Sequence, residues 1–124
     1  MKYLLDVSTL IALVHNSHAF HQLATQWSQG KKLAICPITE LGFLRVSTGF
    51  LKSPMPDARR ALRSLVAKQR PDFIPCDIRA LSGSVAPNST STTDWYLANL
   101  AHAHGMKWAT LDQHARHPAV ELIK

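Results

Sequence analysis

The stretch YLLDVSTLIAL, residues 3–13, places a single carboxylate, Asp6, between two apolar runs. Because burying an unpaired charge is costly, we expect Asp6 to lie at a break between two elements of secondary structure. The apolar residues before it predict a buried strand over Lys2–Leu5. Those after it predict a helix, with Ser8 or Thr9 as its N-cap. The lone acid would then open onto the end of a core strand.

Segments with the patterns of strands and helices alternate along the rest of the chain. This alternation predicts a parallel sheet covered by helices. We expect Thr39 to cap the third helix, which would carry Glu40 in its first turn. The expected strands cover residues 2–5, 32–38, 72–75, 107–111 and 119–123, and the expected helices cover residues 8–14, 18–30, 40–49, 56–70, 77–84 and 94–105.

The length of the chain predicts one domain, residues 1–124, which is long enough to bury a core. The one long polar segment, Ser82–Thr93, is expected to be a functional or mobile loop. It is not expected to be a domain linker, because the part of the chain that follows it is too short to fold alone.

The composition is basic, with 14 Lys and Arg against 8 Asp and Glu, a formal net charge of +6. Such a charge suits a polyanionic partner such as RNA or DNA, although basic residues also serve solubility alone. The two cysteines have neither the spacing of a metal site nor that of a disulfide framework. No signal peptide and no apolar run of membrane-spanning length is evident, so we expect a cytoplasmic protein with no membrane partner.

Four of the eight acids occupy informative positions. Asp6 and Asp112 each follow a strand directly, while Glu40 and Asp94 each lie in the first turn of a helix. Ligands of open α/β sheets bind beyond the carboxyl ends of the strands, which predicts one edge for Asp6 and Asp112, joined by Glu40 on the helix after the second strand. The segment before Asp94 is less regular, so the pattern alone does not place that acid. A simpler interpretation, acids that stabilise helix N-termini, explains Glu40 and Asp94 individually but explains Asp6 and Asp112 less well.

Four gathered carboxylates would repel one another strongly at neutral pH. A hard divalent cation such as Mg²⁺ or Mn²⁺ relieves that repulsion and prefers oxygen ligands. It also binds phosphate oxygens and lowers the pKa of a bound water. This chemistry is suited to hydrolysis of phosphodiester bonds.

Motifs spread over nearly the whole chain resemble the PIN-domain family and, within it, the VapC-like ribonuclease toxins of toxin–antitoxin pairs. The resemblance implies a three-layer α/β/α sandwich with a mostly parallel central sheet. It also implies an endoribonuclease that depends on Mg²⁺ or Mn²⁺, an RNA substrate, a cognate antitoxin protein and a homodimer. The matching stretches are LLDVSTLIAL, HAFHQLATQW, CPITELGFLRV, TDWYLANLAHAHG and WATLDQ, in the order of the family.

The resemblance also assigns roles to individual residues. Ser8, two residues after the first acid, and Thr110, two before the last, match hydroxyls that would hold a carboxylate or a metal-bound water. After the last acid comes QHARH, which lacks the further acid that some members carry, so the resemblance leaves open one metal ion or two. The four acids that match the catalytic and metal-binding set are Asp6, Glu40, Asp94 and Asp112.

Four arginines are candidate RNA contacts. Arg59, Arg60 and Arg63 lie opposite the apolar stripe of their predicted helix, and Arg45 is on the helix that bears Glu40. A solvated charged face is the default interpretation of the first three and the one we favour slightly, and a surface that contacts phosphate groups beside an acidic cleft is the alternative. Arg45 could equally contact RNA or hold a carboxylate. Without the four candidate ligands, however, 14 basic residues stand against only four acids, as expected for an acidic site in a basic body.

Two other functions compete with catalysis by a nuclease. A PIN-like module that binds RNA or a protein without cutting would retain the basic surface, but we would expect it to have lost at least one of the four acids. A phosphoryl-accepting domain would use a strand-end Asp as its nucleophile, but DVST, residues 6–9, lacks the second acid two positions on.

The seven histidines lack the spacing of a zinc site.

Overall fold

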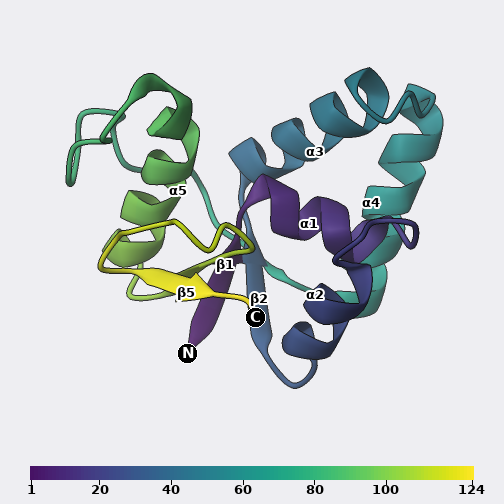
Figure 1. Cartoon of the computed structure of the whole chain (residues 1–124), viewed down its shortest axis with the longest axis horizontal. Helices are drawn as coiled ribbons and strands as arrows, with labels where there is room; N and C mark the ends of the chain where they lie inside the picture. The colour runs from purple at the N-terminus through teal and green to yellow at the C-terminus, as the bar shows by residue number, and fades with distance from the viewer.

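The computed structural model describes residues 1–124 and contains a five-stranded sheet in the order β3-β2-β1-β4-β5 (Figure 1). Every neighbouring pair of strands is parallel. The elements are β1 (Lys2–Leu5), α1 (Val7–Val14), α2 (His21–Ser28), β2 (Lys32–Ile35), α3 (Pro37–Gly49), α4 (Met55–Gln69), β3 (Asp72–Phe73), a 3₁₀ turn (Ser89–Ser91), α5 (Thr92–Ala103), β4 (Lys107–Thr110) and β5 (Val120–Leu122).

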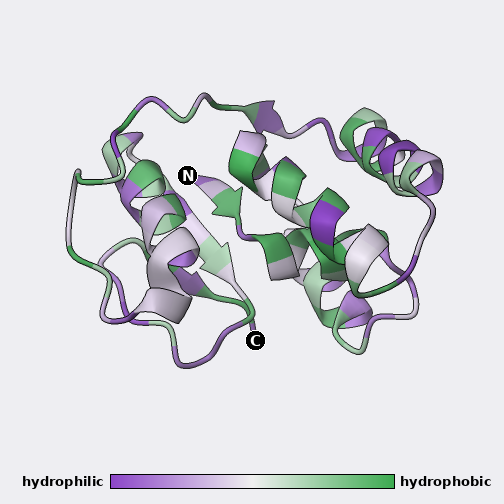
Figure 2. Ribbon diagram, turned by 90° about the horizontal axis from the view of Figure 1, so that it is seen from above, coloured by the Kyte–Doolittle hydropathy of each residue, from purple (hydrophilic) through white to green (hydrophobic).

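Helices cover both faces of this sheet, which confirms the predicted three-layer α/β/α architecture. Helices α1 to α4 lie on one side and α5 lies on the other (Figure 1). The central strand explains the division, because successive side chains of a strand point to opposite faces. Leu5 packs in the core beneath α1 to α4, and Leu4 packs in the core beneath α5. Figure 2 shows hydrophobic residues concentrated in the middle of the molecule.

The structure corrects two predicted helix starts. Helix α1 begins at Val7, and its N-cap is Asp6, whose side chain accepts a hydrogen bond from the backbone of Thr9. The prediction of Ser8 or Thr9 as the cap was wrong because the acid that ends the strand also caps the helix. Helix α3 begins at Pro37, in the first turn where proline is tolerated, so Thr39 lies inside the helix rather than at its cap.

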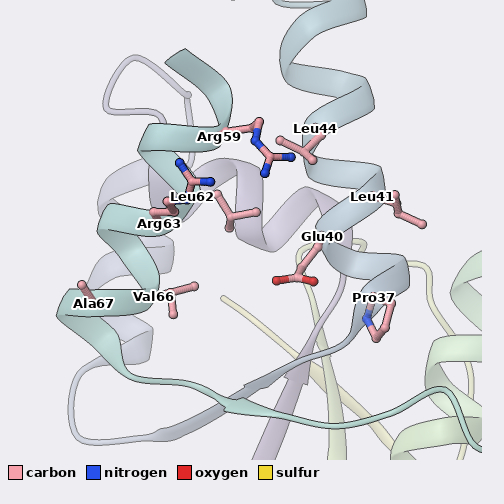
Figure 3. A pocket seen from close by; sticks show the side chains of 9 residues that line it. All are labelled: Pro37, Glu40, Leu41, Leu44, Arg59, Leu62, Arg63, Val66 and Ala67. Atoms are coloured by element: carbon pink, nitrogen blue, oxygen red, sulfur yellow. The ribbon is translucent and has the colours of Figure 1, made fainter. Parts of the chain in front are cut away.

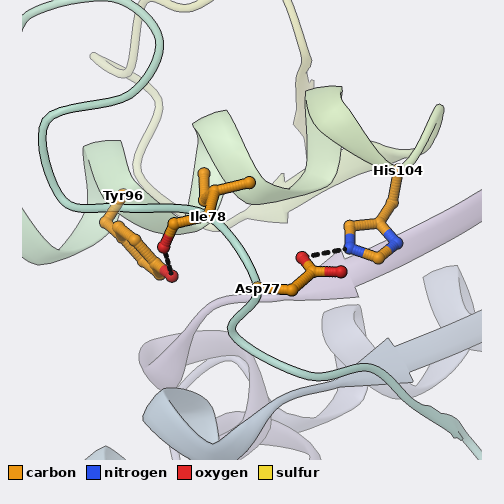
Figure 4. Close-up of polar contacts among 4 residues, drawn as sticks. All are labelled: Asp77, Ile78, Tyr96 and His104. Atoms are coloured by element: carbon orange, nitrogen blue, oxygen red, sulfur yellow. Dashed lines mark hydrogen bonds and ion pairs between the residues drawn. The ribbon is translucent and has the colours of Figure 1, made fainter.

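The predicted helix over residues 77–84 is absent, and that segment is irregular. Side chains of α5 fix it instead. The hydroxyl of Tyr96 donates to the carbonyl of Ile78 at 2.7 Å, and Asp77 accepts from His104 at 2.8 Å (Figure 4). The bond from Tyr96 satisfies a backbone carbonyl that a helix would have satisfied locally.

None of the helices is both long and apolar enough to cross a membrane.

Candidate active site

The carboxyl edge of the two central strands brings Asp6 beside Thr110. Strands β1 and β4 pair with Leu5 opposite Ala109, so the next residue of each strand lies at the same level. The backbone N–H of Asp6 donates to the carbonyl of Ala109 at 3.2 Å, which extends the ladder to this point. The predicted position of Asp6 at the end of a core strand is therefore confirmed.

Asp6 is only 2% exposed, and three donors hold its carboxylate. The hydroxyl of Thr110 donates to Oδ2 at 2.5 Å, while the backbone N–H of Thr9 and the hydroxyl of Ser8 donate to Oδ1 at 2.8 and 3.2 Å. Burial raises the pKa of Asp6 above its ordinary value. The hydrogen bonds oppose this rise, and the bond from Thr110 lowers the pKa most. The apolar runs around Asp6 are thus compensated by a set of dedicated donors.

The hydroxyl of Thr110 also links Asp6 to Asp112. It accepts a hydrogen bond from the backbone N–H of Asp112 at 3.1 Å while it donates to Asp6. The carboxylate of Asp112 accepts from the backbone N–H of His114 at 3.0 Å and is otherwise exposed. One buried threonine therefore sets the relative positions of two predicted acids.

Asp94, in the first turn of α5, lies near both of these acids. Burial, followed by the negative charges of Asp6 and then Asp112, raises its pKa to about 6. Mutual repulsion of this kind requires the carboxylates to be close. The structure therefore brings Asp6, Asp94 and Asp112 together as the sequence predicted, and we call these three residues the aspartate trio.

Glu40 has different surroundings. It lies in the first turn of α3 and lines a cavity of about 570 Å³ between α3 and α4, which it shares with Arg59 and Arg63 (Figure 3). Burial alone raises its pKa, with no contribution from the aspartate trio. The structure thus sets Glu40 apart from the other three predicted acids.

Two contacts nevertheless fix the first turns of α3 against the edge. The hydroxyl of Thr39 donates to the carbonyl of Leu5 at 3.0 Å, one residue before Asp6. Gly42 lies against Val7, where an added Cβ would come within 2.3 Å of Cγ2 of the valine. A glycine inside a helical pattern is the sequence signal that could have indicated this packing.

The donor set at this edge suits a hard divalent cation, because it consists of carboxylates whose charges repel one another. The carboxylate of Asp6 has accepting capacity left beyond its three hydrogen bonds. No group of three or more His, Cys, Asp or Glu side chains is arranged to hold a metal ion in this conformation. The fit therefore rests on the chemistry of the donors rather than on an assembled cage.

The four arginines predicted to contact RNA fall in three places. Arg59 and Arg63 line the cavity with Glu40, and Arg45 lines another cavity, between α3 and α5. Arg60 is exposed and pairs with Asp57 at 3.1 Å, as a solvated helix face would.

Comparison with known proteins agrees with this architecture. A family model described as the PIN domain matches residues 3–121. The chain is 35% identical over 118 residues to ribonuclease VapC38 of Mycobacterium tuberculosis, an alignment that covers 88% of this chain and 84% of that protein. It is 33% identical over 125 residues to ribonuclease VapC44 of the same organism, with 91% and 87% covered.

Two solved structures share the fold. One is the VapBC2 complex from Rickettsia felis bound to a DNA fragment from its promoter, with a TM-score of 0.66, 16% identity, and 98% of this chain and 97% of that chain covered. The other is DNA-bound VapBC from Salmonella typhimurium, with a TM-score of 0.60, 20% identity, and 98% and 96% covered. The match over residues 3–121 and the two VapC relatives show that the chain belongs to the PIN-domain family, among proteins named VapC ribonucleases.

Proposed function

We propose that this protein is a metal-dependent endoribonuclease and the toxin of a toxin–antitoxin pair. The observation that carries the proposal is the grouping of Asp6, Asp94 and Asp112 at the carboxyl edge of the sheet, where Thr110 links Asp6 to Asp112 and Asp94 lies in the first turn of α5. Burial, and then the charges of Asp6 and Asp112, raise the pKa of Asp94. Three mutually repelling carboxylates are costly to a fold unless they serve a cation. The relatives named ribonucleases support RNA as the substrate.

The aspartate trio, with Glu40, would hold Mg²⁺ or Mn²⁺. When bound, the ion would act as a Lewis acid on the scissile phosphate and lower the pKa of a water for in-line attack. Donors from Ser8 and Thr110 fix the carboxylate of Asp6 in one orientation, so its remaining lone pairs face a defined direction.

The charge distribution of the chain supports a nucleic-acid substrate. Arg45, Arg59 and Arg63 line the two cavities on either side of the first turns of α3, and each would attract phosphate groups toward the acids. These arginines would thereby draw a polyanion to the edge of the sheet, although the carboxylates make that edge locally negative when no cation is bound.

The proposed partners are an antitoxin and a second copy of the chain. Both structural neighbours are VapBC complexes, which supports a cognate antitoxin for this protein. The homodimer rests on the family resemblance alone, and light scattering of the purified chain would test it.

Cleavage of RNA by protein freed of any co-purified antitoxin tests the proposal. Wild-type protein should cut RNA with Mg²⁺ or Mn²⁺ and stop on addition of EDTA, and Asp6→Asn should be inactive. Asp77→Asn is the matched control, because Asp77 pairs with His104 at the C-terminal end of α5, whereas Asp94 lies in its first turn, and it should retain activity. Cleavage that persists in EDTA would contradict the proposed metal. RNA binding without any cleavage would favour a non-cutting PIN-like module.

A further inference from the structure

A cavity of about 550 Å³ lies between α3 and α5, separate from the cavity of Glu40. The two cavities occupy adjacent faces of α3 and share one wall residue, Leu41, which is 66% exposed. The volume of the cavity between α3 and α5 falls within the range of about 300–1,000 Å³ that is typical of sites for small ligands.

The walls of this cavity adjoin the aspartate trio. Val7 follows Asp6 directly in the chain, and Thr93 precedes Asp94 directly. A substrate whose phosphate lies against these acids must therefore place a neighbouring part of itself at or near this cavity.

One wall is a segment of chain that side chains of α5 hold in place, residues 78–84, which we call the strap. At one end Tyr96 donates to the carbonyl of Ile78 at 2.7 Å (Figure 4). At the other end the amide of Asn99 donates to the carbonyls of Ser82 and Ser84 at 3.2 and 3.0 Å. Ala80, which lines the cavity, lies between these two anchored ends.

The close fit of the strap explains a glycine within it. Gly83 has φ of +75°, and an added Cβ would lie 2.6 Å from Cγ of Asn99. The indole N–H of Trp95 also donates to the hydroxyl of Ser84 at 3.0 Å. The wall is thus largely formed before any ligand binds, which reduces the entropy lost on binding.

The lining combines apolar and aromatic surface with a single charged group. Leu41, Val7 and the ring of Tyr96 supply the apolar part, and Arg45 supplies a cation. A nucleobase suits such a surface through its flat apolar faces, and a phosphate suits the guanidinium. A base can enter a cavity of this kind only when it is free of pairing and stacking.

We propose that this cavity binds the base of an unpaired nucleotide next to the scissile phosphate, with Arg45 contacting the adjoining backbone phosphate. The proposal rests on the proposed ribonuclease function and adds to it a subsite for the base beside the cleaved bond. The cavity would therefore select for unpaired regions and would contribute to sequence preference.

Filling the cavity from the strap tests the proposal. Ala80 is exposed and lines the cavity, whereas its neighbour Leu81 is 85% exposed and does not, so Ala80→Trp and Leu81→Trp form a matched pair. Affinity for short, fluorescently labelled single-stranded RNA should fall about 5- to 100-fold in Ala80→Trp, the factor that corresponds to the stacking of one base. Leu81→Trp should bind as the wild type does, and a labelled RNA duplex should bind both variants equally.

The role of Arg45 is tested by the salt dependence of the same binding. Arg45→Ala should reduce the slope of log affinity against log salt concentration by about 0.7, the value for one phosphate contact on a single strand. Lys32→Ala removes one charge at the opposite edge of the sheet, where Lys32 pairs with Asp72, and should leave the slope unchanged.

Each outcome separates this inference from the proposed function. If RNA is cleaved but Ala80→Trp binds single-stranded RNA as tightly as Leu81→Trp does, the cavity is not a base site and the ribonuclease function stands. If Ala80→Trp loses only a co-purified protein partner, the cavity belongs to that protein and the inference is wrong. If wild-type protein neither cuts nor binds RNA, the proposed function is wrong and this inference falls with it.

Discussion

Asp94 and Glu40 differ in what raises their pKa values, although both were predicted to belong to one site with Asp6 and Asp112. Burial and the charges of Asp6 and Asp112 both raise the pKa of Asp94, whereas burial alone raises that of Glu40. Glu40 also faces a cavity that contains two arginines (Figure 3). Both acids lie in the first turn of a helix, but that position alone does not bring a carboxylate close to the other acids. The face of the helix on which the residue lies decides which groups surround its carboxylate.

Neutralising one aspartate of the trio should have the largest effect on RNA cleavage. Asp94→Asn should reduce the rate about 10³-fold, or about 4 kcal/mol in the activation free energy, because a ligand charge is removed from the centre. Glu40→Gln should reduce it by a smaller factor, because Glu40 is not coupled to the trio. Single-turnover cleavage at saturating Mn²⁺ measures both, and an equal loss in the two variants would contradict the distinction.

Removal of the threonine hydroxyl that joins Asp6 to Asp112 should have the next largest effect. Thr110→Val loses the donor to Asp6 and the acceptor for the N–H of Asp112, and we expect a 10- to 100-fold loss of cleavage or metal affinity, about the usual cost of losing such support. Thr110→Ser keeps the hydroxyl and should retain most of the activity. If the serine variant is as impaired as the valine variant, then packing of the methyl group matters rather than the hydrogen bonds.

The contact that brings α3 to the edge can be strained by one methyl group. Gly42→Ala should lower the free energy of unfolding by about 1–3 kcal/mol, because the new Cβ would collide with Val7. Gly49→Ala, near the end of the same helix, meets no atom within 4 Å and should be neutral or stabilising. Urea unfolding of both variants measures the difference. Equal stabilities would show that α3 shifts freely and does not fix Glu40 relative to Asp6.

The smallest expected effect is on stability as a function of pH in the metal-free protein. The pKa of Asp94 rises from its ordinary value of 3.8 to about 6 on folding, so its ionisation opposes folding. The stability that the protonated form contributes is present below about pH 4 and is lost as the pH rises through about 6. Asp94→Asn should therefore raise the midpoint of thermal unfolding at about pH 8 and change it little at about pH 4. A variant that is destabilised at the higher pH would show that Asp94 is not repelled in the folded state.

The fold was largely predictable because the apolar pattern of each strand and helix agrees with its place in the sheet. Leu4 and Leu5 read as a strand buried on both faces, and the structure packs one leucine into each core. Helix starts were less predictable, because several residues near a boundary can each cap a helix. Asp6 was assigned to the site, and its second role as the N-cap of α1 was missed.

The segment over residues 77–84 shows where local pattern fails. Its composition resembles that of a short helix, but Tyr96 and Asn99 bind its backbone from a helix about 15 to 20 residues later in the chain. The shared edge of Asp6 and Asp112 was predicted from strand ends, for which topology alone suffices, whereas the irregular segment before Asp94 kept the pattern from placing that acid. The separate environment of Glu40 depends on the packing of α3 against α4, and no short-range pattern encodes it.

Titration of Mn²⁺ into the protein, followed by electron paramagnetic resonance, tests the central claim most directly. We expect wild-type protein to bind Mn²⁺, Asp94→Asn to lose most of that affinity, and Asp77→Asn to bind as the wild type does. Unchanged Mn²⁺ binding by Asp94→Asn would contradict the claim that the aspartate trio is the metal-binding centre.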